Sequence, residues 1–231
     1  MGELVNPKKG EVTTPGSPRL GFEEPIDQGD LIIPRAKLFQ GTPTEADEYP
    51  DAKGGQVINS LTKEVLPSVF VPVFKFTEVV KFNGRNQKDP DFNPAYAPGA
   101  LIWKVTDPQD PRWAEGDFGP NGEKPLAMRT LRFLSYFPGV QMPVIVSFAK
   151  TSYRAGKQLL SLAQFTPGNM FDRRYRLGTK KEESDGNTYH VFTVALDGIS
   201  TDEERTIALD WYKALRGKAL KVHEDDVGFT E

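Results

Sequence analysis

The segment whose residue types point most clearly to binding chemistry is MFDRRYRLGT, residues 170–179. It places Arg173, Arg174 and Arg176 around Tyr175 within four consecutive positions. Arginine forms charge-assisted hydrogen bonds to phosphate, and a tyrosine ring can stack on a nucleotide base. This combination is typical of a surface for unpaired nucleic acid.

A strand through this segment would place alternate side chains on opposite faces, which leaves two arrangements open. In the first, Arg173 and Tyr175 face outward and present a ring beside a guanidinium group. In the second, Tyr175 is buried with Leu177, while Arg174 and Arg176 form a basic face toward the solvent. Both arrangements fix arginines on a rigid sheet surface.

Further basic and aromatic residues of the same kind lie upstream of this segment. A helix predicted to begin near residue 152 would also offer its first backbone N–H groups to an anion. The upstream candidates for contact with nucleic acid are Arg129, Arg132, Lys150, Tyr153, Arg154 and Lys157.

The distribution of charge supports this interpretation. The net charge of the 231-residue chain is only −3. Residues 129–181, however, contain ten Lys or Arg and one acidic residue, whereas residues 182–231 contain twelve acidic and five basic residues. Such asymmetry is typical of a protein with a polyanionic partner and an acidic tail.

Little in the sequence indicates catalysis. There is no cysteine, and the two histidines, His190 and His223, match no metal-binding or catalytic spacing. The sequence also contains no phosphate-binding loop, dinucleotide fingerprint, zinc-protease motif or serine-hydrolase elbow. We therefore expect a protein that is not an enzyme and that uses no cofactor.

One alternative keeps catalysis open. Carboxylates crowd the predicted loop at residues 107–125, and oxygen ligands of this kind hold Mg²⁺ or Ca²⁺ in metal-dependent phosphodiesterases. Acidic residues next to proline and glycine are also common turn formers. The candidate ligands are Asp107, Asp110, Glu115 and Asp117.

The elements that would position these residues are mostly strands. The chain contains 21 glycines and 19 prolines, more turn formers than a helical bundle usually has. The dipeptide Asp185-Gly186 predicts a two-residue hairpin turn. Alternating or apolar runs predict strands at residues 31–40 (interrupted by Pro34), 54–60, 63–82, 100–107, 128–137, 143–151, 170–179 and 189–196.

Two helices complete the prediction. Residues 152–165 form one, with Thr151 or Ser152 at its start and Pro167 after its end. Residues 201–216 form the other, where Thr201 and Glu204 match a capping box. The result is an α+β domain, mostly β, with a helix inserted between groups of strands.

In this layout the chain resembles phage-encoded single-stranded DNA-binding proteins of the oligonucleotide-binding (OB) barrel type. The resemblance rests on the basic middle, on the order PVIVSFAKTSYRAGKQLL…MFDRRYRLGTKKEESDGNTYHVFTV, and on an acidic end that carries Phe229. It spans roughly residues 31–231. It implies an OB-like antiparallel barrel with one inserted and one C-terminal helix. It also implies non-catalytic protection of exposed DNA strands in replication or recombination.

The acidic C-terminal segment HEDDVGFTE leaves three roles open. It would dock on replication or recombination proteins, lie in a basic groove until nucleic acid displaces it, or simply keep the terminus soluble. The candidate partner-binding residues are Asp225, Asp226 and Phe229.

Together these patterns predict a disordered arm at residues 1–30, one nucleic-acid-binding domain at 31–220 and an acidic tail at 221–231. With no long apolar run and no export leader, we expect a location in the host bacterial cytoplasm and no membrane contact. The expected function is non-enzymatic binding of single-stranded DNA, or of RNA. The alternative is a phage structural or adaptor protein that acts through protein–protein contacts, which the long Pro/Gly-rich loops also suit.

Overall fold

The computed structural model describes residues 32–184, 186–218 and 220–222. The predicted arm at residues 1–30, Asp185 of the predicted turn, and the tail residues Asp225, Asp226 and Phe229 lie outside the described residues.

Ten strands and three α-helices are arranged in the order β-β-α-β-β-β-β-β-α-β-β-α-β among these residues. The strands are β1 (Ile32–Ile33), β2 (Ala36–Leu38), β3 (Val57–Asn59), β4 (Val69–Phe82), β5 (Leu101–Val105), β6 (Met128–Tyr136), β7 (Val144–Phe148), β8 (Arg173–Ser184), β9 (Asn187–Ile199) and β10 (Lys221–Val222). The helices are α1 (Pro43–Glu48), α2 (Tyr153–Phe165) and α3 (Asp202–Leu215), with short 3-10 helices η2 (Pro111–Gly116), η3 (Lys150–Ser152) and η4 (Met170–Asp172).

The central sheet is antiparallel and has the order β7-β6-β4-β8-β9, with β5 attached to β4. The long strand β4 connects its two halves, because it pairs with β6 along most of its length and with β8 only at Val69 and Phe70. The prediction of an α+β, mostly antiparallel fold with a middle and a C-terminal helix is confirmed.

The predicted closed OB-like barrel is not found. No strand pairing joins the outer edges of β7 and β9 in the part of the chain that the structure describes. Instead, the segment at residues 34–40 contacts both edges. Pro34 accepts a hydrogen bond from the backbone N–H of Ile145 in β7 (2.8 Å). The side-chain amide of Gln40 bonds the backbone of His190 in β9 in both directions (2.7 and 3.1 Å). The segment therefore bonds to one residue of each edge, Ile145 in β7 and His190 in β9, and lies between the two strands.

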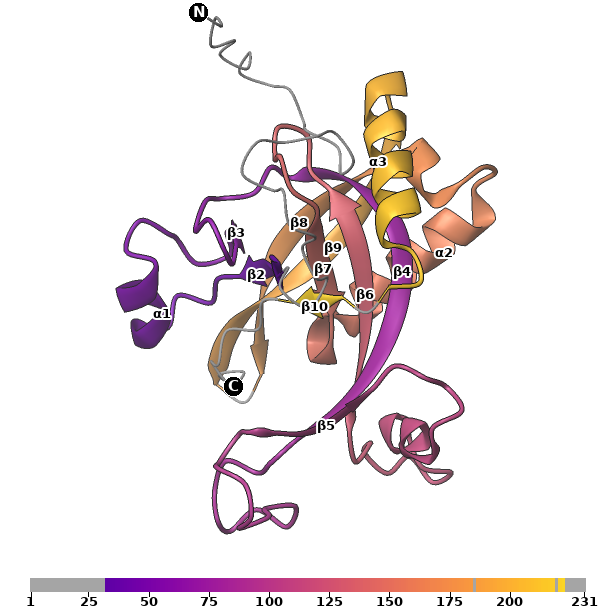
Figure 1. Cartoon of the computed structure of the whole chain (residues 1–231). Helices are drawn as coiled ribbons and strands as arrows, with labels where there is room; N and C mark the ends of the chain where they lie inside the picture. Colours follow the sequence, from indigo (N-terminus) through magenta and orange to yellow (C-terminus); the bar gives the residue numbers. More distant parts are fainter. Residues whose placement is uncertain (1–31, 185, 219, 223–231) are drawn as a thin grey trace, which may run out of the picture.

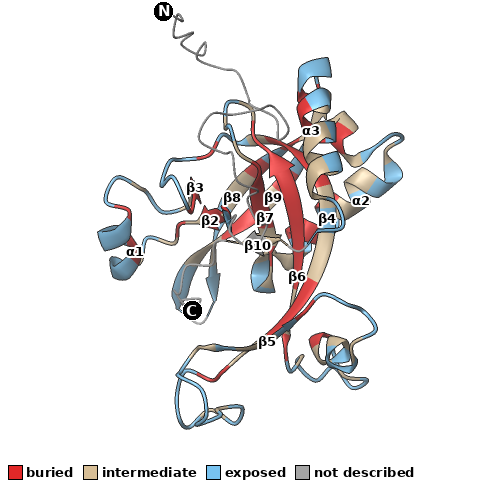
Figure 2. Ribbon diagram, viewed as in Figure 1, coloured by how far each residue is buried: buried red, intermediate tan, exposed pale blue. Residues whose placement is uncertain are grey.

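Helices cover the two faces of the sheet (Figure 1). Helix α2 packs on one face, where Leu159 joins Phe133 and Phe148 in the larger core cluster. Helix α3 packs on the other face, where Ile207 joins Leu134 in a second cluster. Figure 2 shows the buried residues concentrated in the central strands, while α1 and the loops around β5 are largely exposed. Adjacent residues such as Phe133 and Leu134 lie in different clusters because side chains alternate along a strand.

The local signals in the sequence set several boundaries correctly. The capping box of α3 is present, with the Thr201 and Glu204 side chains each bonded to the other residue's backbone N–H. Strands β8 and β9 are joined by a two-residue connection, since Ser184 pairs with Asn187 and Gly186 has φ +78°. These predictions are confirmed.

The predicted hairpin between residues 54–60 and 63–82 is only partly correct. The chain does turn near Lys63, which has φ 65°, but β3 pairs with β2, and only one isolated bridge, Ile58 to Val65, connects it with the following segment. Pro67 offers no N–H to extend that ladder, so a continuous strand starts only at Val69.

No helix among the described residues is long and apolar enough to cross a membrane.

The packing of α2 against β7 gives a stability prediction at Gly156. A Cβ added there would lie 2.6 Å from Cβ of Phe148. We expect Gly156→Ala to destabilise the protein by about 1–3 kcal/mol through overpacking, although alanine is the better helix former by about 1 kcal/mol. Urea unfolding measures the change. Ser161→Ala, at an exposed position of the same helix, is the control and should not destabilise. A Gly156→Ala protein more stable than wild type would contradict this packing.

Candidate functional site

The structure divides the ten residues predicted to contact nucleic acid into three groups. They lie on β6, around the start of α2, and on β8. The groups are Arg129 and Arg132; Lys150, Tyr153, Arg154 and Lys157; and Arg173, Arg174, Tyr175 and Arg176.

The residues on β8 adopt the second of the two arrangements that the sequence left open, in which Tyr175 is buried and Arg174 and Arg176 face the solvent. Tyr175 is 0% exposed and packs with Phe70 in the larger core cluster, and Leu177 is buried beside it. Burial raises the pKa of the Tyr175 phenol, and the charge of Arg173 offsets this only in part. A ring without exposed surface does not fit the predicted contact of Tyr175 with a ligand.

The outward arginines of β8 are engaged by carboxylates. Arg176 Nη2 donates to Oδ1 of Asp197 (2.5 Å), and Arg174 Nη2 lies 3.5 Å from Oδ2 of the same residue. Arg174 Nη1 also lies 3.7 Å from Oε1 of Glu204. Two acidic residues that the sequence separates from these arginines by more than 20 positions thus balance much of the predicted basic face.

Arg129 is held away from the other candidates. Its Nη1 lies 2.9 Å from Asp117 Oδ1, and its guanidinium group stacks on the Trp113 ring at 5.1 Å. Alternate residues of β6 face the other way, and these include Thr130 and Arg132, which line a cleft.

This cleft has a volume of about 590 Å³ and is lined by polar groups from several parts of the described chain. It is lined by the last residues of β4 and the start of β5, and it lies between the segment at residues 34–40, strands β6 and β7, η3, and the hairpin end of β9. Its titratable lining residues are Arg35, Lys37, Glu45, Arg132, Lys150, Tyr189 and His190, and its aromatic lining residues also include Phe82 and Phe192.

Four cationic side chains therefore line the cleft with the carboxylate of Glu45, and two of the four, Lys37 and Arg132, are paired with carboxylates outside the lining. Two of them, Arg132 and Lys150, were predicted from the sequence, and two, Arg35 and Lys37, were missed. The alternation of Arg35 and Lys37 along one strand face was the only signal in the sequence that could have identified them.

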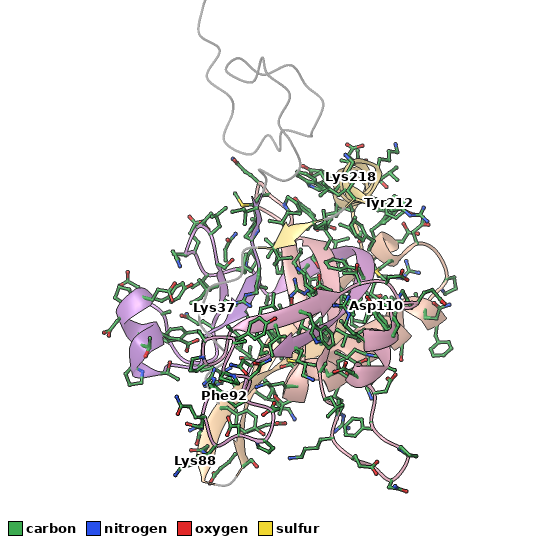
Figure 3. The ribbon with its side chains drawn as sticks, turned by 60° about the horizontal axis from the view of Figure 1, so that its bottom comes forward. Lys37, Lys88, Phe92, Asp110, Tyr212 and Lys218 are labelled. Carbon is green, nitrogen blue, oxygen red and sulfur yellow. The ribbon has the colours of Figure 1, made fainter. Side chains whose placement is uncertain are left out.

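Two of the cations are fixed by neighbouring groups. Lys37 Nζ lies 3.3 Å from Glu48 Oε2 and 4.5 Å from the centre of the Tyr49 ring. Figure 3 shows Lys37 between α1 and the central strands. Arg132 Nη2 lies 3.1 Å from Oε2 of Glu78, and both side chains are nearly fully buried. Lysine and arginine held in this way approach a ligand with little freedom left to lose.

The floor of the cleft also holds hydroxyl groups with unused hydrogen-bonding capacity. Thr130 Oγ1 and Ser147 Oγ are buried, and neither has a hydrogen-bond partner among the described residues. Both residues line the cleft. Buried polar atoms are nearly always satisfied in proteins, so these two hydroxyls are exceptions among the described residues.

The residues at the start of α2 lie beside this cleft, and two of them are more exposed. Lys157 Nζ lies 5.7 Å from the centre of the Tyr153 ring, and Arg154 is exposed. Ser152 occupies the N-cap position, but its Oγ accepts the backbone N–H of Phe192 in β9 (3.1 Å) instead of capping the helix. That bond ties the start of α2 to the wall of the cleft.

The carboxylates proposed as metal ligands do not converge. Within the described residues, no group of three or more acidic or histidine side chains is placed to hold a metal ion. Asp110 pairs with Arg112, whose hydrogen bonds lower the pKa of the Asp110 carboxyl to about 2. Glu115 pairs with Lys81 (3.1 Å), and Asp117 with Arg129. Glu115 and Asp117 thus anchor the loop to β4 and β6, whereas Asp110 forms its pair within the loop.

Comparison with protein families assigns the chain to a family. Residues 11–221 match the family described as the Pam3 phage gp34-like protein. The chain belongs to the Pam3 phage gp34-like family. The expected phage origin is therefore confirmed, although the family description states no activity. No curated protein and no solved structure is significantly similar to this gp34-like chain.

The burial of Tyr175 in this gp34-like protein gives a second stability prediction. Its hydroxyl group has no hydrogen-bond partner among the described residues. We expect Tyr175→Phe to stabilise the protein by about 1 kcal/mol, because it removes an unpaired buried polar group.

Tyr49→Phe is the matched control. The Tyr49 hydroxyl accepts a hydrogen bond from Lys63 Nζ (2.9 Å), so this change should cost about 1 kcal/mol. Urea unfolding of both variants measures the difference. Destabilisation by Tyr175→Phe comparable to that of Tyr49→Phe would show that the Tyr175 hydroxyl is hydrogen-bonded after all.

Proposed function

We propose that this phage protein binds single-stranded DNA in the cleft, without catalysis, during replication or recombination of the phage genome. The observation that carries the proposal is the convergence of Arg35, Lys37, Arg132 and Lys150 on one cleft from separate parts of the chain. Cations that follow a groove, combined with aromatic rings, are what unpaired strands require.

The form of the cleft supports a single strand as its ligand. Its volume is in the range of about 300–1,000 Å³ that is usual for pockets holding small groups, so it suits a short stretch of nucleotides and not a duplex. Tyr189 offers a partly exposed ring at the rim for base stacking. The hydroxyls of Thr130 and Ser147 belong to lining residues but are themselves buried, so they would donate to phosphate or base oxygens only after a movement that exposes them.

This proposal moves the expected binding site away from β8. Arg174 and Arg176 already interact with Asp197, and Tyr175 is buried. Arg132 and Lys150 remain in the site, and Tyr153, Arg154 and Lys157 extend it along the start of α2.

A gel-shift series with a labelled oligothymidylate at several salt concentrations tests the function. Affinity should fall linearly on a log–log plot against salt, because bound cations release counterions from the strand. Equal affinity for oligouridylate would widen the ligand class to RNA, and absence of a shift at micromolar protein in low salt would refute the function.

A pair of variants tests the location. Lys150→Gln should weaken binding by about 1 kcal/mol, or roughly fivefold, and reduce the salt slope by about 1. Arg176→Gln removes one positive charge from an exposed position on β8, outside the cleft lining, and should leave both quantities unchanged. Equal losses in the two variants would show that binding follows overall charge and not the cleft.

One observation favours a second candidate, a structural or adaptor protein of the phage. Phe118 and Leu126 are 72% and 69% exposed, and both lie in the loop between β5 and β6. Large apolar side chains exposed on a loop suit contact with another protein. This candidate predicts protein that is free of nucleic acid after purification and that gives no oligonucleotide shift.

A further inference from the structure

We propose that the loop between β4 and β5, residues 83–100, is a second part of the strand-binding surface. In it, Arg85 and Tyr96 contact nucleotides that extend beyond the cleft, and Asn83 holds the loop in position. The inference rests on the proposed function, since it extends the same site. It goes beyond that site because neither Arg85 nor Tyr96 is part of the cleft lining.

The loop stands beside the cleft. Phe82, at the end of β4, lines the cleft, and so do Gly99, Ala100 and Leu101, where the chain enters β5. The loop joins these two lining segments, and Figure 1 shows it in magenta, projecting from the sheet beyond the ends of β4 and β5. A strand that leaves the cleft on this side therefore passes the base of the loop.

One buried side chain, Asn83, fixes the base of the loop. It is 4% exposed. Its Nδ2 donates to the backbone carbonyls of Asn93 (3.0 Å), Tyr96 (2.9 Å) and Ala97 (3.1 Å). Its Oδ1 accepts the backbone N–H of Asn93 (2.7 Å). Loops of this length in compact domains are usually functional or disordered, and this one is ordered by its own hydrogen bonds.

The first turn of the loop is closely packed as well. A Cβ on Gly84 would lie 2.9 Å from Cβ of Asp89, and Asp89 Oδ2 accepts the backbone N–H of Asn86 (2.9 Å). The Asp89 carboxylate is thus engaged within the loop. A loop that is ordered before its ligand arrives loses little conformational entropy on binding.

Arg85 is the loop cation nearest to the cleft lining. Its Cγ lies 3.8 Å from the position that a Cβ on Gly99 would take, so its side chain starts beside a lining residue. Arg85 is exposed, and no carboxylate among the described residues pairs with it. Lys37 and Arg132 in the cleft, by contrast, are each paired with a carboxylate. A phosphate would therefore meet in Arg85 a guanidinium group that no neighbouring carboxylate offsets.

Tyr96 supplies an aromatic ring on the same loop. The residue is 39% exposed, and the bond from Asn83 to its carbonyl fixes its backbone next to the end of β4. An exposed ring on a fixed backbone suits stacking on a base. The loop carries two basic and two acidic residues, so the position of Arg85, and not the net charge of the loop, supports the proposal.

Binding of oligothymidylates of graded length tests the inference. Lengths from about 4 to about 16 nucleotides cover the usual site sizes of domains that bind single strands. The shortest oligonucleotides occupy the cleft alone, and the longest also reach the loop. Fluorescence anisotropy of the labelled oligonucleotides measures the affinity at each length.

The decisive variants are Arg85→Gln and Tyr96→Ala, both at exposed positions. Tyr96→Ala should weaken binding of the longest oligonucleotide about tenfold, as expected for the loss of one stacked base, and Arg85→Gln should weaken it roughly fivefold. Neither should alter the affinity for the shortest. The matched controls Phe118→Ala and Arg176→Gln remove an exposed ring and an exposed arginine outside the cleft lining, and should leave all affinities unchanged.

Asn83→Ala tests the positioning role. Amide hydrogen exchange in residues 84–98 should become faster, because the bonds that order the loop are lost. The longest oligonucleotide should bind about tenfold more weakly, while the shortest keeps its affinity. Faster exchange without any loss of affinity for the longest oligonucleotide would show that Asn83 is only structural and would overturn its positioning role.

The outcomes separate the inference from the function. Wild-type affinity of Arg85→Gln and Tyr96→Ala at every length would overturn the inference, while binding by the wild-type protein would still support the function. Equal losses for the shortest and the longest oligonucleotides would also overturn it, since the two residues would then act on the cleft itself. Absence of binding by the wild-type protein at every length would refute the function and the inference with it.

Discussion

The cleft depends on the way in which residues 34–40 connect two sheet edges that do not pair with each other. An exposed edge leaves backbone N–H and C=O groups that must find partners or water. The backbone carbonyl of Pro34 accepts the N–H of Ile145 in β7. The side-chain amide of Gln40 donates to the backbone carbonyl of His190 in β9 and accepts its backbone N–H. This single segment therefore sets the distance between the edges. It also brings Arg35 and Lys37, which lie between its two anchors, into the same space as Arg132 and Lys150.

The cations of the cleft differ in kind from those of β8. Burial of Arg132 next to Glu78 gives a pair that adds little net stability, because desolvation offsets most of the attraction between the charges. What the pair does provide is a guanidinium group fixed at the floor of the cleft. Arg176, by contrast, is largely exposed and shares Asp197 with Arg174, so its attraction for a phosphate is screened by solvent and already partly balanced.

The sequence allowed most of the elements to be predicted and only part of the site. Long alternating runs such as 69–82 and strong end signals such as Thr201 with Glu204 are local, and both helices and most strands lie where these signals predicted. The role of Tyr175 was not predictable in this way. Alternation states that Tyr175 and Arg174 lie on opposite faces, but the packing of Phe70, which is more than 100 residues earlier, decides which face is the core. Closure of the barrel failed as a prediction for a similar reason, since the edges of β7 and β9 are covered by a segment that precedes both in the chain.

The basic residues between 129 and 181 do not form one continuous basic surface in the folded protein. The excess between residues 129 and 181 suggested one continuous basic surface, yet Arg129 pairs with Asp117 and Arg174 with Asp197 and Glu204, all outside that block. Folding thus pairs Arg129 and Arg174 with carboxylates. It also places Arg35 and Lys37, from outside the block, beside Arg132 and Lys150 in the cleft lining. A groove that gathers cations raises the local potential more than the same charges spread over a surface, and this is the physical reason for proposing the cleft as the site for a polyanion.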